Sequence, residues 1–280
     1  ILVFTPILPL DFAAAAAARL TPTLHRAADV EQWATTGLPW HLAIDTGMSR
    51  AGVCWRDVGA LAEVLRRHPP EGAFTHFHSA DRNDATPAEQ ERRFRDALAA
   101  MPHRPAVLHA ENSAALERRA PSPWNVVRPG VFLYGVGSGP GSAVAPEPVV
   151  HLRARVVDLR TLADGETVSY SASYRAVGER RIATLSVGYA DGYRRSLSSR
   201  GTALIGGRRA PVAGLVTMDM TMLDVTDVPC EVGDVATLLG RDGAALLDLE
   251  TVARTAEMSP YELLTGLRGR LPRVVEGAPA

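Results

Sequence analysis

The spacing of apolar residues changes near residue 135, and this change divides the chain into two kinds of fold. Before it, short apolar runs alternate with stretches of helical periodicity, such as Phe94, Leu98 and Met101. Strands that alternate with helices predict βα units around a parallel sheet, so we expect part of a βα barrel. The runs between helices that are expected to be strands are residues 41–44, 73–76, 106–109 and 131–134, and a further strand is expected at 1–5, followed by a helix at about 12–20.

After residue 150 the apolar runs are short and turn residues separate them, which is typical of a mainly β domain. Gly206 and Gly207 predict a hairpin turn, and two helices are expected at 248–255 and 259–267. In the first half, Thr86 and Glu89 predict a helix start closed by a capping box. The expected domains are the βα barrel at 1–137, a glycine- and proline-rich linker at 138–150, and a C-terminal β domain at 151–280.

The charge balance excludes several classes of protein. Thirty basic residues stand against 31 acidic ones, which argues against a general nucleic-acid binder or a basic membrane surface. All of the basic residues are arginine, so these 280 residues cannot supply a lysine amine.

The two cysteines, Cys54 and Cys230, suit a reducing cytoplasm. Pro6, Pro9 and Asp11 interrupt the apolar N-terminal stretch, so we expect neither a membrane span nor a signal peptide there.

Polar residues suited to catalysis or ligand binding follow the expected strands of the first half. In βα barrels, ligands bind at the carboxyl ends of the strands. Asn112 and Ser113 offer a hydroxyl and free N–H groups for a phosphate, or they are a plain helix cap. His76 is a catalytic residue or a satisfied core histidine. Arg128 binds a ligand or pairs with a carboxylate, and Arg50 follows an acidic strand end.

Candidates in the second half are weaker when taken one at a time. Tyr170 and Tyr174 are functional residues or ordinary aromatic residues of a β domain, and Met218 and Asp219 lie at the edge of an expected strand. The sequence has no cysteine or histidine spacing typical of a metal site. It also has no lysine-containing phosphate loop and no Gly-x-Ser-x-Gly motif of a serine hydrolase.

Taken in order, seven segments resemble the alanine racemases, the fold-type-III enzymes that use pyridoxal 5′-phosphate (PLP). The segments are DTGMSR at 45–50, THF at 75–77, ENSAA at 111–115, VRPG at 127–130 with LYG at 133–135, SYSASYRA at 169–176, VGYADGY at 187–193 and VTMDMTM at 216–222. The resemblance covers residues 1 to about 273. Seven segments in the right order make it specific, although each alone is modest.

The resemblance implies a PLP-binding barrel followed by a β domain, in a head-to-tail homodimer. Each active site would combine one subunit's barrel with the partner's β domain. The cofactor-binding residues would be Asn112, Ser113, Arg128, Gly130 and Val131. Among these, the serine, the glycine and the valine match residues that hold the phosphate, and the arginine matches the donor to the pyridine nitrogen.

The same resemblance implies the catalytic and substrate-binding residues. Tyr170 matches the tyrosine base, which reaches across from the other subunit, and His76 matches the histidine that supports both Arg128 and this tyrosine. The residues implied to bind or admit the substrate are Arg50, Met218, Asp219 and Tyr189. The first three match residues at the substrate carboxylate, and the last resembles a tyrosine at the entrance to the site.

These roles predict a two-base proton transfer at Cα that interconverts L-alanine and D-alanine. PLP supplies the electron sink, and a guanidinium that keeps its protons leaves the pyridine nitrogen unprotonated. A positive network of His76 with Arg128 is expected to lower the tyrosine's pKa from its usual value near 10. The implied cellular role is the supply of D-alanine for peptidoglycan in the cytoplasm.

The sequence departs from the family at three places. The family's PLP-holding lysine, which is also the second base, lies before the region that matches Ile1, so we expect an N-terminally truncated barrel and an inactive chain. Ala43 stands where many relatives carry a lysine that supports the arginine matched by Arg50, which then needs another partner. Gly269 stands near a position where relatives often have a tyrosine, which implies a wider pocket.

Two alternatives follow from these departures. A wider pocket favours a racemase of broader specificity that also accepts serine. The missing lysine favours a non-catalytic paralogue that binds PLP or a partner. Against the second alternative, a chain freed from catalysis has no need of Tyr170, Arg128 and His76.

Overall fold

The computed structural model describes residues 1–82, 84–118, 122–137 and 146–275. The chain divides into two compact units, one built on Ile1–Phe132 and the other on Leu133–Val136 with the chain from Pro146 onward. We describe each unit by itself. The expected linker at 138–150 lies largely outside the described residues, at 138–145.

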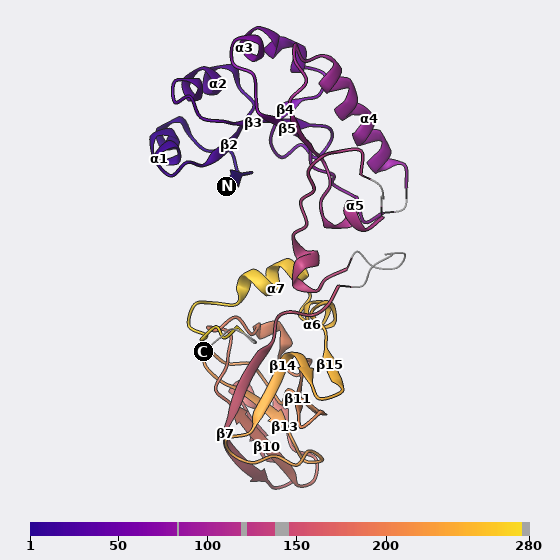
Figure 1. Cartoon of the computed structure of the whole chain (residues 1–280). Coiled ribbons are helices and arrows are strands. Elements are labelled where there is room, and N and C mark those ends of the chain that lie inside the picture. Colours follow the sequence, from indigo (N-terminus) through magenta and orange to yellow (C-terminus); the bar gives the residue numbers. More distant parts are fainter. Residues whose placement is uncertain (83, 119–121, 138–145, 276–280) are drawn as a thin grey trace. The chain divides into compact units, whose positions relative to one another are not determined.

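The first unit is a parallel sheet with helices on its outer side (Figure 1). Its strands run in the order β1-β2-β3-β5-β6, and β4 pairs with β3. The strands are β1 (Leu2–Val3), β2 (Thr21–Leu24), β3 (His41–Asp45), β4 (Val53–Cys54), β5 (Gly72–Phe74) and β6 (Val107–His109). The helices are α1 (Phe12–Ala17), α2 (Ala27–Ala34), α3 (Ala62–Arg67), α4 (Thr86–Ala99) and α5 (Ser113–Arg118), with short 3-10 turns η1 (Pro9–Asp11), η2 (Val58–Leu61) and η3 (Val131–Tyr134).

Side chains alternate along the strands, so one face of the sheet packs in the hydrophobic core against the helices and the other face carries the polar side chains. Leu42 and Ile44 of β3 are buried in the apolar cluster that also holds Trp33 and Phe94 from the surrounding helices. The intervening residues point the other way, because successive side chains of a strand alternate between the two faces of the sheet. His41 of β3 therefore faces the inside of the curved sheet, where the site described below is assembled.

The second unit is a mainly antiparallel sheet with strand order β12-β11-β14-β7-β10-β13. Its strands are β7 (Leu152–Leu162), β10 (Arg180–Leu185), β11 (Thr202–Ile205), β12 (Arg208–Pro211), β13 (Thr221–Asp224), β14 (Val235–Asp242) and β15 (Ala245–Leu247), with a separate pair β8 (Thr167–Val168) and β9 (Tyr174–Arg175). The remaining elements are the 3-10 turns η4 (Tyr170–Ala172) and η5 (Arg195–Leu197) and the helices α6 (Leu249–Thr255) and α7 (Pro260–Gly266).

The predicted fold class, a partial βα barrel followed by a mainly β domain, is confirmed. Several local predictions hold as well. Gly206 and Gly207 join β11 to β12 with φ angles of 55° and 75°, as a tight hairpin turn requires. At α7 the Ser259 side chain and Glu262 form a capping box.

Two local predictions are wrong. Residues 131–134 form the 3-10 turn η3 rather than a strand. Thr86 lies inside α4 rather than capping it, and the residue at the cap position, Ala85, has no side-chain acceptor. The Thr86 N–H instead donates to Asp84 Oδ1 at 2.9 Å, so the acidic residue two positions earlier satisfies the free donor.

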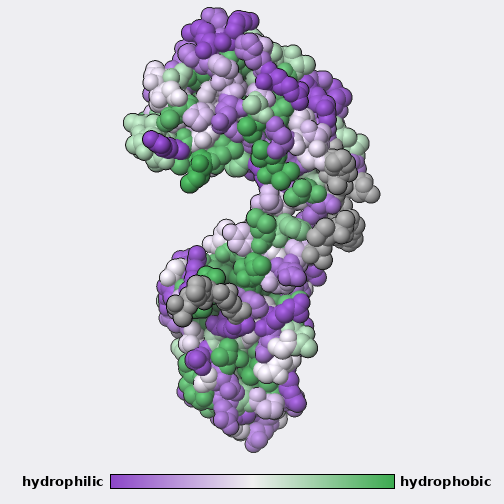
Figure 2. Space-filling view, in the orientation of Figure 1, coloured by the Kyte–Doolittle hydropathy of each residue, from purple (hydrophilic) through white to green (hydrophobic). Residues whose placement is uncertain are grey.

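The exposed large apolar side chains of the first unit lie mainly near the N-terminus. Ile1, Phe4, Leu8 and Leu10 are all more than 40% exposed. Figure 2 shows hydrophobic residues, in green, along the lower edge of the first unit in this view. Within the described parts of the chain, every helix is too short or too polar to cross a membrane.

Candidate active site

The loop after β3 is folded around the carboxylate of Asp45. Its Oδ1 accepts hydrogen bonds from the backbone N–H groups of Gly47 (2.9 Å) and Ser49 (3.0 Å). Ser49 adopts a left-handed conformation, with φ of 55°, at the end of this turn. The turn thus returns the chain so that Arg50 lines a small cavity together with His76.

A buried glutamine ties this loop to the next one. Gln90 of α4 donates to Thr46 Oγ1 and to the carbonyl oxygen of His76, both at 3.1 Å. Its own Oε1 accepts from the N–H of His78 at 3.0 Å. The hydroxyls of Thr46 and Thr75 also lie 2.7 Å apart. These bonds hold the loops after β3 and β5 in one arrangement. Gln90 was not among the residues predicted from the sequence.

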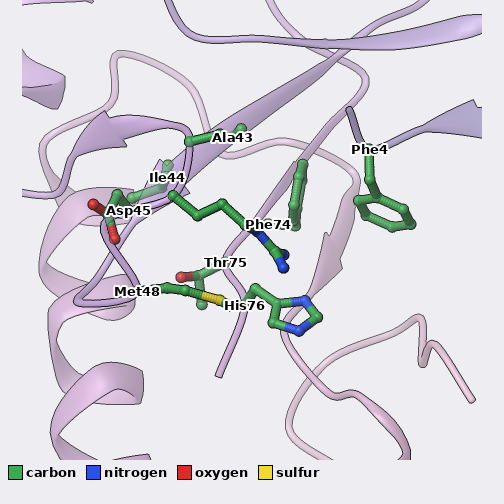
Figure 3. Close-up of a pocket in the computed structure, with 10 residues that line it drawn as sticks. Phe4, Ala43, Ile44, Asp45, Met48, Phe74, Thr75 and His76 are labelled. Atoms are coloured by element: carbon green, nitrogen blue, oxygen red, sulfur yellow. The ribbon is translucent and has the colours of Figure 1, made fainter. Parts of the chain in front are cut away.

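The cavity lined by Arg50 is shown in Figure 3. Ala43 and Asp45 come from β3, Phe74 ends β5, and His76 lies two residues beyond it. Ala43 is only 5% exposed, and it lines this cavity with a methyl group at the position where the resemblance implies a lysine in many relatives.

The side chain of Arg128 is held by several acceptors inside the first unit. Its Nη1 lies 2.8 Å from His109 Nδ1, and its Nη2 donates to the carbonyl oxygens of Thr75 (2.9 Å) and Ala110 (3.0 Å). A longer contact of 3.5 Å joins Nη2 to His76 Nδ1. The backbone N–H of Arg128 donates to the carbonyl of Glu111 at 2.9 Å, which attaches this segment to the end of β6.

Burial and neighbouring charge set the protonation of this cluster. Burial lowers the pKa of Arg128 to about 10, and Glu111 opposes the shift, so the guanidinium is charged at neutral pH. Burial, then Arg128 and Arg50, lower the pKa of His76 to about 4. The expected positive network of His76 with Arg128 is therefore corrected: His76 is neutral at pH 7, and the positive charge belongs to the two arginines.

The candidate phosphate site lies at the start of α5. Ser113 Oγ accepts from the N–H of Gly130 at 2.8 Å, and a weaker contact of 3.4 Å comes from the N–H of Phe132. Asn112 caps the helix through Oδ1 to the N–H of Ala115 and donates from Nδ2 to the carbonyl of Phe77. Asn112 therefore acts as a helix cap here, and Ser113 is left beside the 130–132 turn that includes Val131.

In the second unit, Tyr170 occupies an unusual turn. Ser169, Ser171 and Ala172 have φ angles of 69°, 59° and 49°, which non-glycine residues rarely adopt. The Ser169 hydroxyl donates to the carbonyl of Leu215 at 3.0 Å, which anchors the turn. The Tyr170 side chain is 71% exposed. Such strain is found where a side chain must be presented in a particular direction.

Tyr189, Met218 and Asp219 lie together in the second unit. The N–H of Tyr189 donates to the carbonyl of Thr217 at 3.0 Å, which joins the two segments. The Asp219 carboxylate is held by Arg270, whose Nη2 lies 2.7 Å from Oδ1. The side chain of Asp219 is therefore committed to an ion pair, and Met218 remains 53% exposed.

The structure brings together three predicted groups: His76 with Arg128 and Arg50, Ser113 with Gly130, and Tyr189 with Met218 and Asp219. The sequence reading missed His109, which accepts from Arg128. Strand alternation was the available signal. His109 and Val107 share one face of β6, and the buried Leu108 occupies the other.

The two units match two sequence families. Residues 1–138 match the family described as "Alanine racemase, N-terminal domain", and residues 149–275 match "Alanine racemase, C-terminal domain". The chain is 37% identical over 273 residues to the alanine racemase of Sorangium cellulosum, covering 91% of this chain and 72% of that protein. It is 36% identical over 288 residues to that of Geobacillus kaustophilus, covering 98% and 74%. The chain spans about two thirds to three quarters of the length of the curated relatives it matches.

Solved structures agree with the sequence relatives. The crystal structure of alanine racemase from E. faecalis superimposes with a TM-score of 0.91 at 31% identity, covering 98% of this chain and 77% of that one. The alanine racemase from Bartonella henselae, solved with covalently bound pyridoxal phosphate, gives 0.88 at 26% identity, covering 98% and 78%. From its sequence, its two matched domains and its fold, this chain belongs to the alanine racemase family.

Proposed function

We propose that this chain binds PLP and forms the part of an alanine racemase that holds the cofactor and supplies one of the two bases. The observation that carries the proposal is the placement of Arg128, a charged donor held rigidly by carbonyl and imidazole acceptors. Relatives named alanine racemase, one of them solved with covalently bound pyridoxal phosphate, support the cofactor and the substrate.

The residues present fit PLP at its pyridine nitrogen. The contacts of Arg128 leave one Nη1–H and the Nε–H without an acceptor in the described part of the chain. A guanidinium donates hydrogen bonds but does not give up a proton near neutral pH. Facing the ring nitrogen, Arg128 would keep that nitrogen unprotonated, which limits the electron withdrawal of the ring and favours return of the proton to Cα.

The residues also fit the phosphate. Ser113 offers a hydroxyl whose oxygen accepts the N–H of Gly130 at 2.8 Å, so a phosphate oxygen would take the place of Ser113 Oγ at this N–H, and Val131 would add a backbone N–H from the same turn. Nothing lies closer than 3.9 Å to the position of a Cβ on Gly130, so the backbone there is open to a close ligand. We propose that these three residues bind the phosphate oxygens and that Asn112 fixes the start of α5 beside them.

PLP, when bound, supplies the electron sink that makes the Cα proton of the amino acid acidic. We propose that Tyr170 takes or returns the proton on one face of Cα. A tyrosine hydroxyl in water ionises near pH 10, so a base of this kind needs nearby positive charge at neutral pH. Arg128 and Arg50 would supply that charge, and the neutral His76 would accept a hydrogen bond between them.

We propose that the substrate carboxylate is bound by Arg50 and by the segment of Met218 and Asp219. Because the Asp219 side chain is paired with Arg270, its backbone N–H rather than its carboxylate would meet the anionic substrate. Tyr189, 38% exposed, would border the entrance to the site.

We propose that the active assembly is a homodimer in which Tyr170 and the Met218 segment act with the barrel unit of the partner. The high exposure of Tyr170 and Met218 in the second unit supports this arrangement. We propose a cytoplasmic location, which the two unpaired cysteines, Cys54 and Cys230, support. The supply of D-alanine for peptidoglycan is proposed from the family alone.

The second base of the proposed reaction is not among these residues. The 280 residues contain no lysine, so we expect them to bind PLP without racemising alanine unaided. A broader racemase that accepts serine is favoured by the open space at Gly269, where no atom lies within 4 Å of a Cβ. A non-catalytic PLP-binding paralogue is favoured by the absent lysine.

A PLP titration tests the proposal. All four tryptophans (Trp33, Trp40, Trp55 and Trp124) lie in the first unit, so their fluorescence reports ligand binding there. We expect PLP to bind more tightly than pyridoxal, and Ser113→Ala to reduce this preference at least tenfold. Asp164→Asn, in the second unit, should leave it unchanged. Equal binding of both compounds by the unmodified chain would refute the phosphate site.

Activity assays then separate the alternatives. Formation of D-alanine from L-alanine by these residues alone would refute the requirement for a lysine base. Turnover of serine at a rate comparable with alanine, in an active protein that contains this sequence, would favour the broader racemase. PLP binding without any turnover in that protein would favour the paralogue.

A further inference from the structure

A chain of side-chain contacts leads away from Arg128 through the inside of the first unit. Arg128 Nη1 lies 2.8 Å from His109 Nδ1, and His109 Nε2 lies 2.9 Å from His41 Nδ1. His41 Nε2 in turn lies 3.5 Å from Glu71 Oε2. These four residues line one cavity of about 460 Å³, and only Glu71 at its far end is half exposed.

The surrounding sheet is built to hold the two imidazoles. His41 is paired in register with Gly72 of β5, and a Cβ on Gly72 would lie only 2.6 Å from His41 Nδ1. Glycine therefore makes the space that the His41 ring fills. On the neighbouring strands, the Phe74 ring stacks on His109 at 4.9 Å with an interplanar angle of 4°.

The contacts determine where each hydrogen lies. A guanidinium only donates, so His109 Nδ1 is an acceptor and carries no hydrogen. A neutral imidazole with a bare Nδ1 carries its hydrogen on Nε2, which faces His41 Nδ1. His41 must then also carry its hydrogen on Nε2, and this nitrogen faces the Glu71 carboxylate, which only accepts. Each N–H of this chain of contacts therefore points away from Arg128 and toward Glu71.

The charges that face the two histidines agree with neutral rings. His109 faces Arg128 and His41, and burial followed by these two groups lowers its pKa to about 3. His41 faces His109 and Glu71, and burial lowers its pKa although Glu71 opposes the shift. A protonated His109 would turn an N–H toward the donating guanidinium, so protonation would break the 2.8 Å contact with Arg128.

We infer that His41 and Glu71 are positioning residues that fix His109 in its Nε2–H tautomer, so that His109 accepts from Arg128 and holds the guanidinium in place. His41 acts by accepting from His109, and Glu71 acts by accepting from His41. The tautomers follow from the contacts alone. Their consequence for PLP rests on the proposed role of Arg128.

The first test needs neither cofactor nor turnover. The chain labelled with ¹⁵N-histidine is studied by long-range ¹H–¹⁵N correlation at pH 7, and the eight histidines are assigned by single His→Gln variants. We expect His41 and His109 each to show one neutral species with hydrogen on Nε2. A hydrogen on Nδ1 of either ring, or a doubly protonated ring, would overturn the inference whether or not PLP binds.

The second test uses a matched pair of variants at position 41. His41→Gln keeps a side-chain acceptor for His109, and His41→Leu removes it. We expect His109 to keep its single Nε2–H species in the first variant and to lose it in the second, where a second tautomer or a protonated form appears. An unchanged His109 spectrum in His41→Leu would show that His41 does not fix the tautomer. Should that variant not fold, Glu71→Leu removes the acceptor of His41 at the half-exposed end of the chain; we expect His41 then to lose its single Nε2–H species, and an unchanged His41 spectrum would overturn the inference.

Discussion

Acid should destabilise the first unit through His109, which is fully buried. In the folded chain burial lowers the pKa of this histidine to about 3, whereas in the unfolded chain it titrates near 6.5. Above pH 6.5 neither state binds the proton and the stability is complete. Between pH 6.5 and pH 3 only the unfolded state binds it, so stability falls as the pH is lowered.

The size of this effect follows from the two pKa values. Each pH unit below 6.5 costs about 1.4 kcal/mol for one such group, so acidification to pH 4.5 removes about 2.7 kcal/mol through His109 alone. That is a large share of the free energy of unfolding of a typical domain, about 5–15 kcal/mol. The variant His109→Gln keeps an acceptor for Arg128 but cannot bind the proton, so it should be spared this loss.

The assay is urea unfolding followed by tryptophan fluorescence at pH 7.0 and pH 4.5. His109→Gln should lose about 2.7 kcal/mol less than the unmodified chain between the two pH values, and the exposed His103→Gln should lose as much as the unmodified chain. The reasoning is refuted if the His109→Gln and unmodified chains lose equal stability. It is also refuted if His103→Gln is spared to the same degree.

Three further predictions concern the rest of the molecule. Arg128→Met should destabilise the first unit by at least about 1–3 kcal/mol, because it leaves buried acceptors that the guanidinium satisfies, the carbonyl oxygens of Thr75 and Ala110 and the ring of His109, without a donor; the measurement is tryptophan-detected unfolding. Gly188→Ala should destabilise the second unit by about 1–3 kcal/mol, because a Cβ there would overlap the carbonyl oxygens of residues 217–218. Its unfolding is followed by tyrosine absorbance, since all six tyrosines lie in that unit. Gly269→Tyr should change that stability by less than about 0.5 kcal/mol, because no atom lies within 4 Å of a Cβ at Gly269, and should lower serine turnover in an active protein that contains it.

Local signals predicted the elements that local interactions decide. The capping box of Ser259 and Glu262 and the two-glycine turn after β11 depend on residues within four positions of each other, and both form as expected. Residues 131–134 show the limit of such signals. An apolar run of four residues has too few positions to distinguish a strand from a 3-10 turn, and its conformation depends on the segment it meets.

The candidate site was predictable as a set of residues but not as a set of contacts. Arg128 and Ser113 stand out in the sequence beside their glycine and asparagine neighbours, yet the partner of Arg128 does not. His109 reaches it only because residue 128 lies beside the end of β6, a pairing of distant segments. The neutral state of His76 could not be predicted either, since it depends on burial and on Arg50 across the cavity.

The hydrogen-bond partners of Arg128 explain how a buried guanidinium can stay charged and still donate to a ligand. Its hydrogen-bond acceptors are two carbonyl oxygens and a neutral imidazole, and its guanidinium also lies 5.3 Å and 5.5 Å from the ring centres of Phe4 and Phe74. A carboxylate in direct contact would orient the group equally well, but it would cancel the charge and occupy a pair of N–H donors. Neutral acceptors fix the orientation and leave the charge uncancelled. Glu111 raises the pKa without a hydrogen bond to the guanidinium, which keeps the group protonated while two of its N–H donors remain available to a ligand.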